Sequence, residues 1–156
     1  MPHPEKPGTN ALRIERVDHD FPAGAVWNFP NGRRGTVRVR FQLLPGPAQT
    51  SITLTDHFSS PFDVEGELNG LFTLSLAAEE AGPNGRLLKP NSWHDLELTW
   101  DLDKRTCAAS VDQSRWAELP LLRLMTEGAC YLRFRSLADG PAKGGMLIES
   151  VSARVE

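Results

Sequence analysis

Residues 91–112, NSWHDLELTWDLDKRTCAASVD, carry the clearest strand and turn pattern of the sequence. Within residues 95–100, apolar and polar side chains alternate with the period of two that a half-buried antiparallel strand requires. The polar residues 101–104 predict a reversal of the chain, and the alternation resumes over residues 107–111. The stretch therefore predicts a β-hairpin that buries Trp100 on its apolar face.

The same alternation predicts further strands, which are separated by turn signatures. Because glycine supplies positive φ angles and proline presets φ, their clusters with Asn or Asp predict tight reversals, here at residues 30–32, 45–47, 82–85 and 139–141. The further predicted strands are residues 12–15, 37–43, 52–55, 72–76, 131–135 and 151–155. Short strands with regular turns predict an all-β fold of two packed antiparallel sheets. Residues 116–125 show no clear period, and Pro120 argues against a long helix there.

Length, composition and net charge limit the possible domain organisation and the possible partners. We expect a flexible N-terminal lead-in over residues 1–10, which are rich in proline, and one β-sandwich domain over residues 11–156. The net charge is -3 and the pI is near 5.8, which gives no electrostatic reason to expect a nucleic-acid partner. No apolar run approaches the roughly 20 residues of a membrane-spanning helix, so no membrane association is expected.

The first eight residues bear on localisation, and the two cysteines bear on the redox state. Residues 1–8 lack the apolar core of a signal peptide, which points to the cytoplasm for the chain as written and to secretion if it was cut from a longer precursor. Cys107 and Cys130 lie in apolar, strand-like contexts, and we expect two buried reduced thiols because free cysteine behaves as a small hydrophobe. A disulfide stays open as an alternative if the two strands are neighbours.

No metal or cofactor is predicted. The separation of Cys107 from Cys130 fits no zinc site. Asp101, Asp103 and Asp112 could supply the oxygen ligands that calcium prefers, but the Asp-x-Asp-x-Asp-Gly loop of such sites is missing.

Six segments, taken in order, resemble a known family. They are AVWNFP (25–30), GTVRVRF (35–41), ITLTDHF (52–58), WHDLELTWD (93–101), YLRFR (131–135) and LIESV (147–151). Together they resemble a concanavalin A-like (laminin-G-like) jelly roll, and more narrowly the lectin-like β-sandwich modules attached to bacterial sialidase-type glycoside hydrolases. The resemblance covers residues 11–156. One departure is the turn after Asp112, where Gln113 stands in place of the glycine of many such hairpins.

The resemblance implies a two-sheet antiparallel sandwich with one concave face. Members of the family often bind carbohydrate on that face or in its rim loops, and many serve as accessory or packing domains. An oligosaccharide, an adjacent catalytic domain and a second copy of the chain are therefore the candidate partners. The catalytic propeller of a sialidase is not part of these residues, so sialidase activity does not carry over.

Strand alternation turns one set of polar side chains away from the predicted core. These are Arg38, Arg40, Asp95, Glu97, Thr99, Tyr131, Arg133 and Arg135. If their strands share a sheet, the face combines guanidinium groups, carboxylates and a phenol, which suit hydrogen bonds to sugar hydroxyls or to the carboxylate of an acidic sugar. A solvated sheet face with cross-strand ion pairs is the alternative interpretation.

Further candidates lie near strand ends. Asp56 and His57 end a predicted strand and enter a loop, where a rigid sandwich often presents binding residues, and a hydrogen-bonded loop anchor is the alternative. Trp27, like Trp116, lies near a turn and could offer a ring on which a sugar stacks, although core packing is the usual fate of tryptophan. Trp93 stands at a strand entry and could cap the edge of the sandwich.

A catalytic alternative rests on Asp63, Glu65 and Glu67. Glucanases of the same fold carry three alternating carboxylates on one strand, and a retaining mechanism needs two carboxyl groups ~5–5.5 Å apart. Here the residue order differs and Gly66 interrupts the strand, so a solvated loop is the competing interpretation. We therefore predict no catalytic residue. The hypothesis is a non-catalytic accessory or carbohydrate-binding module, with a structural interaction domain and a glycoside hydrolase as alternatives.

Overall fold

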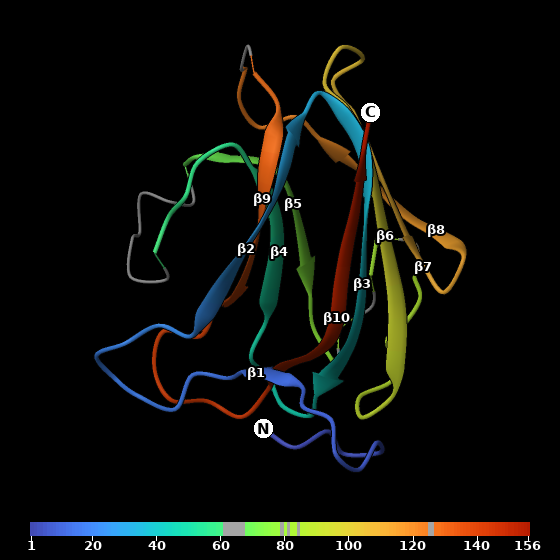
Figure 1. Cartoon of the computed structure of the whole chain (residues 1–156). Coiled ribbons are helices and arrows are strands. Elements are labelled where there is room, and N and C mark those ends of the chain that lie inside the picture. The colour runs from blue at the N-terminus through green and yellow to red at the C-terminus, as the bar shows by residue number, and fades with distance from the viewer. Residues whose placement is uncertain (61–67, 79, 81, 84, 125–126) are drawn as a thin grey trace.

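The computed structural model describes all residues except 61–67, 79, 81, 84, 125 and 126. The described residues form strands joined by turns and loops, and this part of the chain contains no helix long and apolar enough to cross a membrane. The strands are β1 (Leu12–Ile14), β2 (Gly24–Gly32), β3 (Arg34–Leu44), β4 (Thr50–Thr55), β5 (Gly70–Leu76), β6 (Trp93–Asp101), β7 (Thr106–Val111), β8 (Ser114–Pro120), β9 (Ala129–Ser136) and β10 (Gly145–Val155) (Figure 1).

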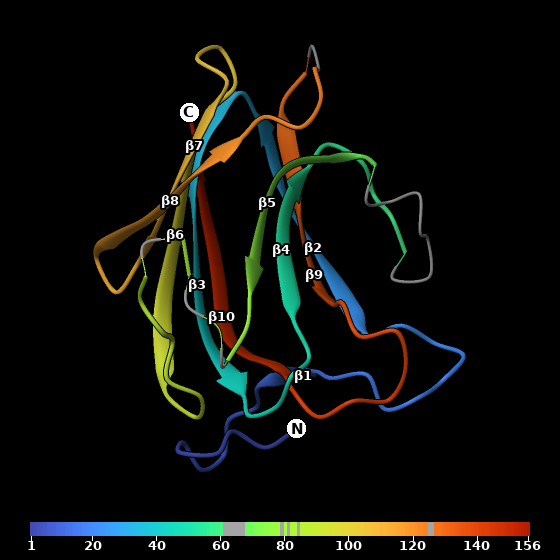
Figure 2. The ribbon, with the colours of Figure 1, turned by 180° about the vertical axis from the view of Figure 1, so that it is seen from behind.

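Two antiparallel sheets form the two layers of a sandwich (Figures 1 and 2). The six-stranded sheet has the order β1-β10-β3-β6-β7-β8, and the four-stranded sheet has the order β2-β9-β4-β5. Many neighbouring strands are distant in the sequence, since β10 pairs with both β1 and β3. The all-β, two-sheet jelly-roll sandwich predicted from the sequence is confirmed.

The core lies between the sheets and follows the predicted alternation. On β3, Val37, Val39 and Phe41 are buried, while the residues between them face outward. Trp100 on β6 is also buried, and its ring centroid lies 5.7 Å from that of Phe29 in the opposite sheet. Removing an aliphatic or phenyl side chain from water stabilises the fold by roughly 1.5–3 kcal/mol. The prediction that Trp100 belongs to the core is confirmed.

The hairpin predicted for residues 91–112 is formed by β6 and β7. The Oδ1 atom of Asp101 accepts the N–H of Lys104 at 3.0 Å in its turn. β7 then continues into β8 through Asp112 and Gln113, whose φ angles are 51° and 62°. Positive φ at both central residues is the signature of a type I′ turn, which matches the twist of the flanking strands. The turn therefore forms without the glycine that many similar hairpins have.

The alternation rule misses two strands, β2 and β8, which both lie at sheet edges. β8 falls in the stretch without a clear period and ends at Pro120, which an edge strand tolerates because one side of its backbone has no ladder partner. Trp116 on β8 is buried, and the guanidinium of Arg86 lies 5.8 Å from the centre of its ring. Trp116 is therefore a core residue and not an exposed stacking platform.

Residues 1–10, expected to be a flexible lead-in, fold back on themselves and against the sandwich. The N–H of Ala11 donates to the carbonyl of Met1, and the N–H of His3 donates to the carbonyl of Thr9, both at 2.9 Å. The His3 residue is 6% exposed. A hydrogen-bonded loop that buries one of its side chains has a defined position on the domain.

Both cysteines are free, and they lie in different sheets, with Cys107 on β7 and Cys130 on β9. Burial raises the pKa of the Cys107 thiol to about 12. Burial also raises the pKa of Cys130, and the nearby carboxylates of Asp56 and Glu127 add to this shift. The two thiols are therefore protonated at neutral pH.

Gly35 on β3 provides a test of the core packing. A Cβ atom there would lie 2.5 Å from the Cη2 atom of Trp100 and 2.5 Å from the carbonyl oxygen of Arg154. Because the buried ring and the β10 backbone are both held in place, Gly35→Ala should lower the free energy of unfolding by about 1–3 kcal/mol, measured by urea denaturation. Gly140→Ala is the matched control, since the nearest atom would be 3.6 Å away, and it should change stability by less than ~0.5 kcal/mol. Equal stability of the two variants would contradict the packing.

Candidate functional site

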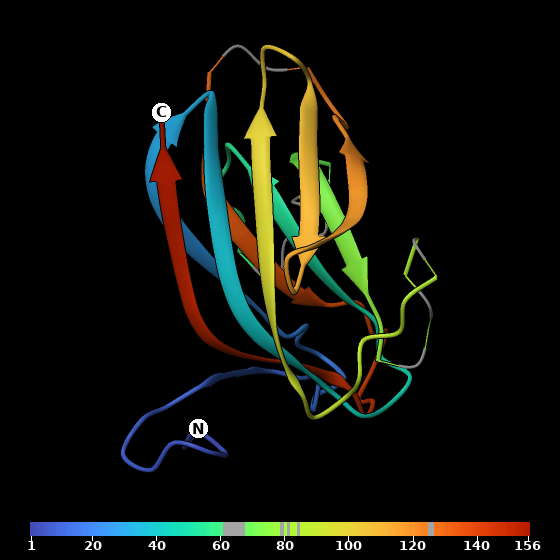
Figure 3. The same cartoon turned by 90° about the vertical axis from the view of Figure 1, so that its right-hand side faces the viewer.

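The outer face of the six-stranded sheet is hollowed into a groove of about 660 Å³. Figure 3 looks onto this sheet. The lining of the groove comes from β10, β3, β6 and β7 and from the β7–β8 turn. Its polar lining includes Arg38, Arg40, Asp95, Glu97, Ser110 and Ser152. Four of the candidate residues predicted from alternation thus meet in one groove.

The register of β3 and β6 places an arginine opposite a carboxylate twice in the groove. Arg38 lies opposite Glu97, and its Nε donates to Oε2 at 2.8 Å. Arg40 lies opposite Asp95, and its Nη1 donates to both carboxylate oxygens, at 3.1 and 2.9 Å. Strand residues two apart point to the same side, so both pairs project into the groove. The cross-strand ion pairs that the sequence left open as an alternative do form between these four residues.

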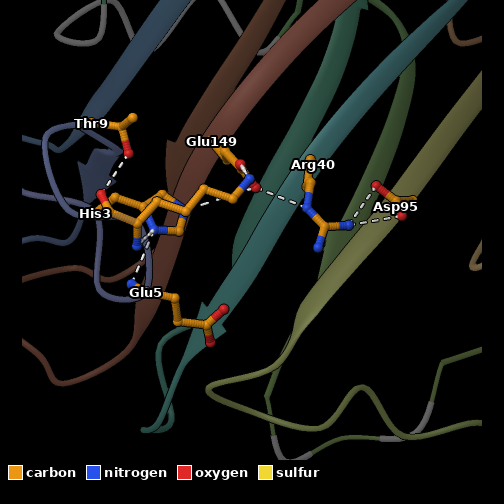
Figure 4. A network of polar contacts seen from close by, with 7 residues as sticks. His3, Glu5, Thr9, Arg40, Asp95 and Glu149 are labelled. Carbon is orange, nitrogen blue, oxygen red and sulfur yellow. Dashed lines mark hydrogen bonds and ion pairs between the residues drawn. The ribbon is translucent and has the colours of Figure 1, made fainter.

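Glu149 joins this network from β10. A β-bulge between Ile148 and Ser150 leaves Glu149 without an opposite residue on β3, and its side chain reaches the arginine on the outer face. Its Oε2 accepts the Nε of Arg40 at 2.8 Å (Figure 4). Its Oε1 accepts the ammonium of Lys6. The hydrogen bond from Lys6, together with that from Arg40, lowers the pKa of Glu149, although desolvation opposes the shift.

Asp112, in the β7–β8 turn, holds the start of β6. Its Oδ1 accepts the N–H of Asp95 at 3.0 Å, and its Oδ2 lies 2.9 Å from the Nδ1 of His94. Burial acts to raise the pKa of Asp112, but the hydrogen bonds from Asp95 and His94 outweigh it, so this pKa lies below its ordinary value. The turn therefore positions the backbone that carries the Asp95 carboxylate.

The predicted polar face is divided between the two sheets. Tyr131, Arg133 and Arg135 lie on β9, which pairs with β2 and β4 in the four-stranded sheet. The condition for one shared face, that these strands belong to the same sheet as those of Arg38 and Arg40, is not met, because β9 lies in the other layer. Arg133 is moreover only 3% exposed, so its side chain does not lie on an open surface.

The rim candidates have structural contacts. Asp56 and His57 follow β4 beside a second pocket of about 560 Å³. The Nδ1 of His57 lies 2.6 Å from Oδ1 of Asp56, Arg123 donates to the same oxygen, and the Asp56 side chain is 13% exposed. This geometry is that of a hydrogen-bonded loop anchor. Trp27 is half-buried and packs against the core, with its ring 5.7 Å from that of Phe29.

The structure adds no support for the catalytic carboxylates or the calcium site considered from the sequence. The carboxylates of residues 63–67 lie outside the described residues. Asp101 and Asp103 lie at the turn between β6 and β7, whereas Asp112 lies at the other end of β7, so the three do not converge. Among the residues that the structure describes, no three His, Cys, Asp or Glu side chains are placed to hold a metal ion.

The sequence did not identify Ser110 and Ser152 as lining residues of the groove, nor Glu149 as the hydrogen-bond partner of Arg40 beside it. The two serines follow the same alternation that predicted their strands, so their outward direction was available from the pattern. Glu149 was not, because the bulge between Ile148 and Ser150 breaks the alternation at that position.

No family model and no curated protein matches the sequence. Solved structures do share the fold. A sialidase superposes with a TM-score of 0.67 and 11% identity, over 89% of this chain and 15% of that chain. The carbohydrate recognition domain of Emp46p, in its potassium-bound form, gives a TM-score of 0.59 and 11% identity, over 92% of this chain and 82% of that chain. An alginate lyase of polysaccharide lyase family 7 gives a TM-score of 0.59 and 10% identity, over 99% of this chain and 84% of that chain.

The fold is therefore a concanavalin A-like, lectin-type jelly roll, as the sequence resemblance predicts. The chain spans 15% of the length of the sialidase that it matches. At these identities the likeness concerns the fold alone. Both a carbohydrate recognition domain and a lyase share this fold, so the fold by itself does not define the function.

The Glu149 network predicts a pH dependence of stability. Because the pKa of Glu149 is lowered on folding, its ionised form stabilises the protein above the ordinary carboxyl pKa of 4.5, and this contribution is lost as the pH falls through the lowered value. Glu149→Gln should therefore destabilise the protein near pH 7, and the difference from wild type should shrink as the pH falls from about 5 to about 3, measured by urea denaturation. Glu97→Gln is the control and should have a smaller effect, because Glu97 pairs with a largely exposed arginine. A pH-independent difference for Glu149→Gln would argue against the network.

Proposed function

We propose that this chain is a non-catalytic carbohydrate-binding module and that the groove on the six-stranded sheet is its binding face. The observation that carries the proposal is the row of guanidinium–carboxylate pairs, in which Arg38 meets Glu97 and Arg40 meets Asp95. Each pair presents N–H donors beside carboxylate acceptors inside the hollow. Adjacent sugar hydroxyls both donate and accept hydrogen bonds, so one pair can bind two hydroxyls of a ring.

Fold stability is a weak explanation for these pairs. Exposed ion pairs stabilise proteins by about 0.2–1 kcal/mol, and the side chains of Arg38 and Glu97 are 72% and 41% exposed. Two such pairs side by side in one hollow are better explained by recognition of a polar ligand. The lectin-type fold supports the same conclusion, since the similar Emp46p domain is a carbohydrate recognition domain.

The charge of the groove favours a neutral sugar. The sequence left open an acidic sugar, whose carboxylate an arginine would bind. In the structure, Arg38 already engages Glu97, and Arg40 engages both Asp95 and Glu149. An anionic sugar would place a further negative charge beside these three carboxylates. We therefore expect neutral oligosaccharides to be preferred over acidic ones.

The accessory role is inferred from size. The chain corresponds to 15% of the sialidase that it resembles, so that protein carries this fold as one part of a longer chain. We infer that the module serves a catalytic neighbour by holding it close to a polysaccharide. A weak, reversible interaction with each sugar would suit this role, because repeated sites along a polymer raise the effective concentration.

Calorimetric titration tests the binding face. We expect neutral gluco-, xylo- or manno-oligosaccharides to bind, and uronate oligosaccharides of equal length to bind several-fold more weakly. Arg40→Ala should weaken binding about tenfold or more, because hydrogen bonds to a charged group contribute about 1.5–3 kcal/mol. Arg154→Ala is the matched control, since Arg154 is exposed on the same sheet and lies outside the groove lining, and it should bind as wild type does.

Two results would overturn the proposal. One is the absence of binding to every sugar of a broad glycan array. The other is a stable dimer in sedimentation that Arg40→Ala disrupts, since this would assign the groove to self-association.

A further inference from the structure

The protein's own N-terminal segment lies on the sheet next to the groove, where His3 contacts Trp93 and Lys6 contacts Glu149. Trp93, the first residue of β6, has the same alternation as Asp95 and therefore faces outward on the same sheet. The imidazole of His3 lies flat on its indole, with the ring centroids 4.7 Å apart and the planes 14° from parallel. Lys6 of the same segment binds Glu149, which also holds Arg40 of the groove (Figure 4). The segment thus contacts two residues beside the groove, Trp93 through an aromatic stack and Glu149 through an ion pair.

His3 occupies this position in a defined orientation. Its Nδ1 accepts the backbone N–H groups of Glu5 at 3.1 Å and Lys6 at 3.0 Å, so the ring proton is on Nε2. Nε2 lies 3.8 Å from the Oε2 of Glu149, which is beyond hydrogen-bond distance. A flat ring on an indole, with a polar edge directed toward a carboxylate, is also the arrangement in which a pyranose stacks on tryptophan and donates a hydroxyl to an acid.

The covered state leaves polar atoms unsatisfied. The Nε1 of Trp93 and the Nε2 of His3 are both buried without a hydrogen-bond partner among the described residues. Leaving a buried donor unpaired costs free energy, which works against the closed arrangement. A sugar has several hydroxyls around its ring and can offer an acceptor to the indole N–H, which the imidazole does not do here.

The hydrogen bonds of the N-terminal segment are largely internal. The N–H of His3 donates to Thr9, and the N–H of Thr9 donates to Lys6, so these hydrogen bonds do not depend on the sheet. The polar and aromatic contacts of His3 and Lys6 with the sheet are made to Trp93 and Glu149, so displacing these two side chains breaks those contacts. Glu149 remains oriented after such a movement, because the Nε of Arg40 still donates to its Oε2.

We propose that Trp93, Glu149 and Arg40 form a second sugar subsite at the end of the groove, and that His3 occupies it until a neutral pyranose ring displaces it. The inference rests on the proposed function, which places the first subsite at the ion pairs of the groove. An oligosaccharide that spans both subsites competes with the N-terminal segment for Trp93 and Glu149. The segment therefore weakens the binding of longer ligands and leaves that of short ligands unchanged.

The first test needs no sugar. In His3→Ala/Lys6→Ala, oxidation of Trp93 by N-bromosuccinimide or hydroxyl radicals, located by peptide mass spectrometry, should rise several-fold over wild type. Trp100 should stay protected in both proteins, since it is buried in the core. Glu5→Ala is the control, because Glu5 contributes its backbone N–H to the loop and should leave Trp93 protected. Unchanged oxidation of Trp93 in the double variant overturns the inference.

The second test is calorimetry with neutral oligosaccharides of increasing length. The double variant should bind the longer ones several-fold more tightly than wild type, and Trp93→Ala in the same background should cancel the gain. Trp93→Phe keeps an aromatic ring and should retain part of it, which separates lost stacking from misfolding. Equal binding by wild type and the double variant overturns this inference alone. Absence of binding to both proteins overturns the proposed function as well.

Discussion

In the β3–β6 ladder, Val39 lies opposite Leu96, and one residue further Arg40 lies opposite Asp95. Consecutive side chains of a strand point to opposite sides, so the first pair enters the core and the second enters the groove. One register therefore sets both the apolar packing and the arrangement of charges. A slip by one residue would bury the arginines and expose the core, so hydrophobic burial holds the charged pairs in register.

Glu149 extends this constraint beyond the ladder. The bulge in β10 directs its carboxylate to Arg40, and Arg40 in turn reaches Asp95, so three strands share one charged network. Lys6 attaches the N-terminal segment to the same carboxylate. A continuous chain of hydrogen bonds, from Lys6 through Glu149 to Arg40, therefore links that segment to the groove.

The alternation of apolar and polar residues was sufficient to predict strands that are buried on one side only. β3, β6 and β7 were predicted because each buries alternate residues, and Trp100 was placed in the core for the same reason. β2 and β8 were not predicted, because apolar and polar side chains do not alternate cleanly along their sequences. Glu149 was not predicted as a partner of Arg40, because an inserted residue in a strand reverses the alternation that the prediction uses.

The outward direction of Arg38, Arg40, Asp95 and Glu97 is encoded locally, because it follows from backbone geometry within one strand. Which outward residues meet depends on the three-dimensional fold, because strand order is set by the way two layers pack across long stretches of chain. The fold brought these four residues into one groove and placed Arg133 and Arg135 in the other sheet. It also laid His3 on Trp93, a contact between residues far apart in the chain that no local pattern encodes.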